Sequence, residues 1–154
     1  MSELDAYRMD PFQAIREYEK TGTHKQGRGP GGSTAARVLD YAALRVRPDG
    51  SARMLEHEIL YMATREAIAA HAEQRIPRGK LLRIRTIKPD GRTFEPEIVS
   101  GKPTATMPHL EVGDYIETET LYDLPSGGRG GRSFLSPRWF FREEKVDYER
   151  SEYV

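Results

Sequence analysis

The sequence predicts a mainly β fold: a two-sheet β-sandwich-like domain with one short internal helix, preceded by a short N-terminal helix and a glycine-rich linker. Several short segments alternate β-branched or aromatic residues with charged ones, and Pro-Asp-Gly turns separate them. Five prolines between Pro77 and Pro108 argue against a long helix there. Short strands with one helix favour two packed sheets, with an open barrel as the alternative. We divide the chain into residues 1–22, 23–34 and 35–154.

The first predicted element is a helix that starts after Asp10 and ends before Gly22. An aspartate suits the N-cap and a glycine suits the position after a helix end. Phe12, Ile15 and Tyr18 form a narrow apolar stripe on this helix. A helix of about eleven residues is too short to be stable alone, so the stripe should dock on another surface. That surface is this domain, a second copy of the chain or a neighbouring domain.

Glycine marks the predicted linker, because nine of the 14 glycines lie in two stretches, Thr21–Gly32 and Ser126–Gly131. The first stretch contains no aliphatic or aromatic residue. It therefore buries too little apolar surface to offset the entropy of ordering it, and we interpret residues 23–34 as a linker.

Two turns predict two hairpins, Arg47–Gly50 and Lys88–Gly91, since each places proline and glycine where a β-turn needs them. Between them, the alanine-rich segment Thr64–Gln74 predicts the internal helix. Tyr115–Tyr122 predicts a half-exposed strand. The last residues, Tyr148–Val154, resemble the middle of a strand, so we expect the domain to be truncated at this end.

The composition excludes several classes of protein. The 24 basic and 24 acidic residues give a net charge of zero, which argues against binding to nucleic acid. The chain has no cysteine, so thiol catalysis, thiolate zinc sites and disulfides are excluded. No apolar run is long enough to span a membrane, and the first residues do not resemble a secretory signal.

The motifs for metal and phosphate binding are incomplete. His57-Glu58 begins like a zinc motif, but Tyr61 stands where the second histidine would be needed. The stretch Gly27–Thr34 resembles a phosphate-binding loop, but Ser33 replaces the lysine. We therefore expect no catalytic residue, no metal and no cofactor.

Two pairs of carboxylates lie at i and i+2 on predicted strands, Glu56 with Glu58 and Glu117 with Glu119. Such residues share a strand face at a separation of roughly 7 Å, which is close to the spacing in glycosidases. Two carboxylates on a solvated strand face are common, however, and this is the interpretation we favour.

The zero net charge divides unevenly along the chain. Residues 35–92 carry 12 basic and seven acidic side chains, and residues 93–154 carry the reverse. We predict that the strand with Arg83 and Arg85 lies beside the strand with Glu117 and Glu119. Such cross-strand pairs would stabilise the sheet by about 0.2–1 kcal/mol each.

Trp139, Phe140 and Phe141 form the densest aromatic cluster. Core packing is the default for such residues. A face that stays exposed would be an interface or a ligand site. Trp139 and Phe140, together with Tyr122 and the helix residues Phe12 and Ile15, are therefore our candidate interface or ligand-binding residues.

Four segments resemble a known bacterial family. They are Val38–Ala52, Arg85–Pro96, Met107–Glu119 and Arg138–Phe141, and the resemblance covers residues 35–154. They are similar to the domain of unknown function that precedes transglutaminase-like domains. The resemblance implies a sandwich-like domain N-terminal to a papain-like Cys-His-Asp domain, in a longer envelope or secreted protein. The sequence departs from this arrangement, because no transglutaminase-like domain follows within it.

We carry three hypotheses of function. The first is a non-catalytic accessory module that interacts with a neighbouring transglutaminase-like or peptidase domain, or with another protein. The second is a carbohydrate- or peptide-binding β-sandwich that uses Trp139 and Tyr122. The third is a glycosidase-like enzyme that uses Glu117 and Glu119.

Overall fold

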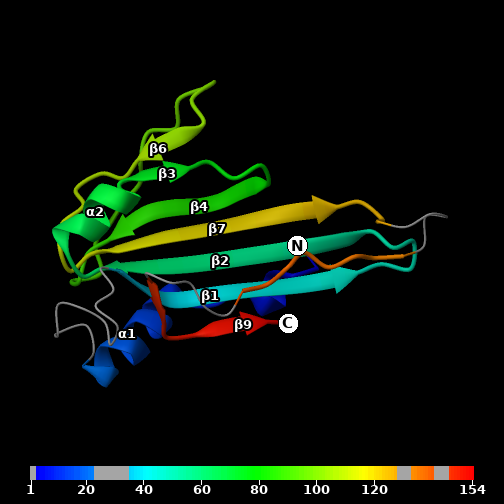
Figure 1. Cartoon of the computed structure of the whole chain (residues 1–154), viewed down its shortest axis with the longest axis horizontal. Helices are drawn as coiled ribbons and strands as arrows, with labels where there is room; N and C mark the ends of the chain where they lie inside the picture. The colour runs from blue at the N-terminus through cyan, green and yellow to red at the C-terminus, as the bar shows by residue number, and fades with distance from the viewer. Residues whose placement is uncertain (1–2, 23–34, 128–132, 141–145) are drawn as a thin grey trace.

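The computed structural model describes residues 3–22, 35–127, 133–140 and 146–154. The predicted linker, much of the second glycine-rich stretch and Phe141 lie outside these residues. The mainly β prediction is confirmed, with two sheets and short helices (Figure 1). The helices are η1 (Asp5–Tyr7), α1 (Pro11–Thr21) and α2 (Arg65–His71). The strands are β1 (Ala35–Val46), β2 (Ala52–Met62), β3 (Glu73–Arg75), β4 (Lys80–Ile87), β5 (Thr93–Phe94), β6 (Thr104–Thr106), β7 (Tyr115–Leu124), β8 (Val146–Tyr148) and β9 (Ser151–Tyr153).

The large sheet has seven strands in the order β5-β4-β7-β2-β1-β8, and β9 also pairs with β1. The Arg47–Gly50 turn joins β1 to β2, and the Lys88–Gly91 turn joins β4 to β5, so both predicted hairpins are confirmed. The ladder between β1 and β2 shifts register between Arg37 and Leu39. The second sheet is the antiparallel pair β3-β6.

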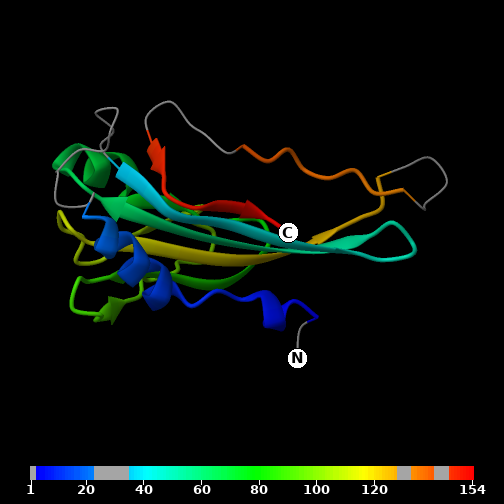
Figure 2. The ribbon, with the colours of Figure 1, turned by 90° about the horizontal axis from the view of Figure 1, so that it is seen from below.

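The large sheet has two differently covered faces (Figure 2). Helix α1 and the N-terminal segment cover one face, which we call the α1 face. Helix α2 covers one end of the other face, and the extended segment 133–140 runs from the opposite end toward the middle; we call this the α2 face. Side chains alternate between the faces along each strand, so residues two apart share a face. Each face thus has its own apolar cluster.

Helix α1 packs against the sheet of its own chain. The Asp10 side chain accepts a hydrogen bond from the backbone N–H of Phe12, and Gly22 ends the helix with a positive φ of 73°. Ile15 and Tyr18 are buried in the core of the α1 face. The docking surface of the predicted helix is therefore this domain, and Ile15 faces that core.

Helix α2 is shorter than the sequence predicts. Thr64 caps it, accepting a hydrogen bond from the N–H of Ala67. The helix ends at His71, however, because Glu73–Arg75 instead pairs with Thr104–Thr106. The predicted C-terminal end of the helix was wrong, because a partner strand distant in sequence supplies the backbone hydrogen bonds of these residues.

Candidate ligand-binding pocket and buried carboxylates

Two carboxylates are buried on the α1 face, where strands β4 and β7 run side by side. Arg83 lies opposite Glu119 and Arg85 lies opposite Glu117, so the predicted strand pairing is confirmed. Glu117 is 0% exposed and Glu119 is 1% exposed. The interpretation of these two residues as solvated was wrong. The alternating sequence pattern shows which residues share a face, but it does not show that α1 and the N-terminal segment cover that face.

Glu117 lies at the centre of a set of cationic or polar partners. Its Oε2 lies 2.5 Å from Nε of Arg85, and its Oε1 lies 2.9 Å from Nε2 of His57. A guanidinium nitrogen of Arg83 is 3.4 Å from Oε1. Burial alone would raise the pKa of Glu117, but the hydrogen bonds from His57 and Arg85 outweigh burial and lower it. Glu117 is therefore held as a carboxylate.

Glu119 is paired with a residue from the N-terminal segment. Nε of Arg8 lies 2.8 Å from one of its carboxylate oxygens, and a terminal nitrogen of Arg8 lies 2.5 Å from the other. This two-pronged geometry is the strong form of an arginine–carboxylate pair. The pair ties the chain before α1 to strand β7. The geometry gives both carboxylates a structural role, and it gives no support to a glycosidase mechanism.

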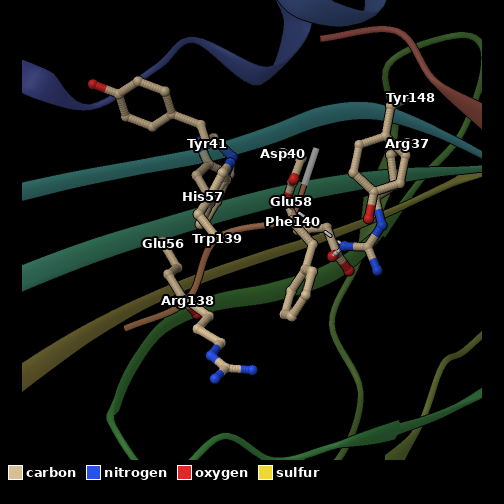
Figure 3. Close-up of a pocket in the computed structure, with 10 residues that line it drawn as sticks. All are labelled: Arg37, Asp40, Tyr41, Glu56, His57, Glu58, Arg138, Trp139, Phe140 and Tyr148. Atoms are coloured by element: carbon tan, nitrogen blue, oxygen red, sulfur yellow. Dashed lines mark hydrogen bonds and ion pairs between the residues drawn. The ribbon is translucent and has the colours of Figure 1, made fainter. Parts of the chain in front are cut away.

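The α2 face carries a pocket of about 510 Å³ between the middle of β1 and β2 and the segment 133–140 that lies over them (Figure 3). Glu56 and Glu58, the other carboxylate pair of the sequence, lie on the β2 side of it. The pocket is lined by Arg37, Asp40, Tyr41, Glu56, His57, Glu58, Arg138, Trp139, Phe140 and Tyr148.

At one end of the pocket the charged groups are paired with each other. Arg37 forms an ion pair with Glu58, and its guanidinium also lies 3.7 Å from Asp40. The same guanidinium lies 5.2 Å from the centre of the Tyr148 ring (Figure 3). Asp40 also accepts a hydrogen bond of 3.0 Å from the hydroxyl of Ser151. The charged groups at this end of the pocket, one guanidinium and two carboxylates, are thus engaged with each other.

Glu56 has a different environment. The hydroxyl of Tyr122 lies near it and favours its charged form, and no ion pair to Glu56 is found within the part of the chain that the structure describes. Burial raises the pKa of Glu56; the Tyr122 hydroxyl opposes that rise and the nearby Asp40 adds to it. Burial, with Glu56 nearby, raises the pKa of Tyr122 to about 12. Glu56 is a partly desolvated carboxylate.

The structure brings three of the five candidate residues from the sequence to this region. Trp139 lines the pocket half-buried, with Nε1 3.1 Å from the hydroxyl of Ser151. Phe140 lines it too and is 66% exposed. Tyr122 supports Glu56 from β7. Phe12, by contrast, lies on the α1 face, where the Arg85 guanidinium is 5.4 Å from the centre of its ring.

Sequence reasoning missed Arg37, Asp40 and Glu56 as pocket residues. A signal was present, because the tight turn of the first hairpin fixes the register of β1 and β2. That register places Asp40 opposite Glu58 and Ala42 opposite Glu56. It would have gathered these charges on one face.

Within residues 3–22, 35–127, 133–140 and 146–154, no cluster of three or more histidines and carboxylates is arranged to bind a metal ion. Nor does any helix in these ranges have the length and apolar character needed to cross a membrane.

Fold and site together define a mainly β domain with a polar and aromatic pocket on one sheet face. No protein-family profile matches the chain, and no curated protein is significantly similar to it. A crystal structure of a "putative protease" from Parabacteroides distasonis ATCC 8503 has a similar fold, with a TM-score of 0.50 and 18% sequence identity. The similarity covers 61% of this chain and 24% of that protein. At this identity, the similarity shows the fold alone.

Proposed function

We propose that this chain is a non-catalytic accessory module of a longer bacterial protein whose catalytic part is a transglutaminase-like or peptidase domain. One observation carries the proposal: the fold covers 61% of this chain but only 24% of the solved "putative protease". A fold that forms a minor part of a longer protein suits a module that positions or regulates another domain. The resemblance of residues 35–154 to the domain that precedes transglutaminase-like domains supports the same function.

The buried carboxylates agree with this proposal. A general acid must reach its substrate and release a proton near the working pH. Glu117 is 0% exposed and its pKa is lowered, so it is suited to neither task. Its three partners, His57, Arg83 and Arg85, supply the opposite charge and the hydrogen bonds that a buried structural carboxylate requires.

Activity assays of the purified chain test the proposal. We expect neither hydrolysis of a peptide library nor transamidation of casein with an amine donor. Turnover that persists through a second purification, at constant specific activity, would contradict a non-catalytic role. The longer protein gives a second test, because disrupting the module should change the rate or substrate preference of the catalytic domain.

A carbohydrate- or peptide-binding module is the second candidate. The observation in its favour is the pocket beside Trp139, Phe140 and Tyr122. The chain has a single tryptophan, so intrinsic tryptophan fluorescence reports on this pocket alone. A flat signal across a panel of oligosaccharides and peptides would count against binding there.

A further inference from the structure

We propose that the pocket on the α2 face binds the basic side chain of an extended peptide, an arginine or a lysine, with Glu56 as its counter-ion. This inference deepens the second candidate function and rests on it. It names the chemical class of ligand and the residue that selects it.

The charges that line the pocket do not balance. Three carboxylates line it, those of Asp40, Glu56 and Glu58, against the two guanidinium groups of Arg37 and Arg138. Arg37 is engaged by Glu58 and Asp40. Arg138 is exposed, and no ion pair between it and Glu56 is present in the described ranges. The pocket thus has an excess of one negative charge, and Glu56 is the carboxylate without a cationic partner among the residues described.

Glu56 is a carboxylate that is partly removed from water. Removing a carboxylate from water is unfavourable unless an opposite charge or several hydrogen bonds replace the water. The group that favours the charged form of Glu56 is the hydroxyl of Tyr122, which is neutral. A bound cation would supply the missing charge, so the free energy gained on binding would be concentrated at this residue.

The pocket also has an exposed aromatic surface, the ring of Phe140. Phe140 is 66% exposed at the pocket, although a phenylalanine usually buries its ring. A guanidinium or ammonium group is attracted to the face of an aromatic ring. The pocket already contains one such arrangement, since the Arg37 guanidinium lies 5.2 Å from the centre of the Tyr148 ring. The methylene groups of a long basic side chain would also cover part of Phe140.

The surroundings of Trp139 favour a basic side chain over a sugar as the ligand. A sugar usually stacks on a flat, exposed indole ring, but the Trp139 ring lies 5.3 Å from the ring of Tyr153 and its N–H is bonded to Ser151. A volume of about 510 Å³ accommodates a long side chain with adjoining backbone. Size, charge and ring exposure together favour a basic peptide over a carbohydrate.

Titration of Trp139 fluorescence with two blocked pentapeptides tests the inference. One has the sequence Ala-Ala-Arg-Ala-Ala, and the other carries citrulline, which has nearly the shape of arginine without its charge. We expect a saturable change with the arginine peptide. The citrulline peptide should bind about tenfold more weakly or worse, the change that corresponds to about 1.4 kcal/mol. Equal affinity for the two peptides would overturn the inference.

Variants of the chain locate the effect. Glu56→Gln should weaken binding of the arginine peptide by a similar factor and leave the affinity for the citrulline peptide unchanged. Phe140→Ala should weaken binding of both peptides. Glu97→Gln, an exposed site away from the pocket, is the matched control and should bind like the wild type. Unaltered binding by Glu56→Gln would overturn the role of Glu56. If that variant does not fold, the comparison of the two peptides on the wild-type chain decides the question.

Oligosaccharides included in the same titration distinguish the basic-peptide inference from the broader binding function. Saturable binding of a sugar, with no difference between the two peptides, would overturn the basic-peptide inference and leave the binding function standing. No response to any ligand would overturn both.

Discussion

His57 and Glu117 lie on adjacent strands, β2 and β7, with Nε2 of the histidine 2.9 Å from Oε1 of the carboxylate and both side chains 0% exposed. Nδ1 of His57 is buried and has no hydrogen-bond partner in the described part of the chain. The α1 face thus holds a charged group where an apolar core is usual. Its stability depends on the partners of Glu117 remaining in place.

Replacing Glu117 with glutamine should destabilise the fold strongly. The substitution keeps the size of the side chain but leaves Arg85 without its counter-charge, 2.5 Å away in the wild type. Removing one partner of a buried ion pair costs about 3–5 kcal/mol. Urea unfolding measures the loss, and Glu97→Gln should change stability by no more than about 0.5 kcal/mol. A loss as small as that of the control would show that the pair does not stabilise the fold.

The pH dependence of stability should report the ionisation of the same carboxylate, that of Glu117. Burial opposes ionisation of Glu117, but the bonds from His57 and Arg85 prevail, and its pKa in the fold lies below the ordinary value. The stabilisation from a lowered pKa is present above the unfolded value of about 4.3 and is lost as pH falls through the folded value. The unfolding free energy of the wild type should therefore fall below about pH 4.3 more steeply than that of Glu117→Gln. Parallel curves for the two proteins would contradict this assignment.

Glu56→Gln should behave in the opposite way to Glu117→Gln. Burial raises the pKa of Glu56, so the folded state disfavours its charged form. At pH 7 a neutral glutamine should leave the melting temperature unchanged or raise it, as expected where a binding residue lowers stability. As pH falls through the raised pKa of Glu56, the stability of the wild type should increase relative to that of the variant. Thermal unfolding of both proteins at several pH values measures this. A clear loss of stability in Glu56→Gln at pH 7 would indicate a structural role.

Gly79 offers a test of the support beneath the pocket. A Cβ at this position would lie 2.6 Å from the carbonyl oxygen of Leu121 and 2.7 Å from Cδ1 of Tyr122. The backbone of β7 has little freedom to move, so Gly79→Ala should cost about 1–3 kcal/mol. It should also displace Tyr122 and weaken binding of the arginine peptide. Gly101→Ala is the comparison, because its φ of +83° is strained but the space around it is open. That variant should lose stability without losing affinity, and equal affinity in both variants would contradict the role of Tyr122.

The elements that the sequence predicts correctly depend on local chemistry. Proline and glycine specify the two hairpin turns, and Asp10 with Gly22 specifies the ends of α1. The opposite charges of β4 and β7 indicate their pairing. The burial of Glu117 is not local, because it depends on a helix about a hundred residues earlier in the chain.

The pocket shows the same division. Trp139 and Phe140 are recognisable as candidates because an aromatic cluster is a local pattern. Glu56 becomes a site residue only because segment 133–140 lies over the sheet and supplies the other side of the pocket. Alternation along β2 places Glu56 and Glu58 on one face but does not distinguish the paired carboxylate from the one without a cation among the described residues. That difference arises from Arg37, a residue of the neighbouring strand.

The most direct test of the binding pocket is the NMR signal of the tryptophan indole N–H. The chain contains one tryptophan, so a ¹⁵N-labelled sample gives one indole cross-peak, from Nε1 of Trp139. The Trp139 N–H donates a hydrogen bond to the Ser151 hydroxyl, which in turn donates one to Asp40 in the pocket. The account predicts that this peak shifts saturably with the arginine pentapeptide, and much less with the citrulline peptide or in Glu56→Gln. A peak that stays in place with the arginine peptide, or shifts equally with both peptides, would contradict it.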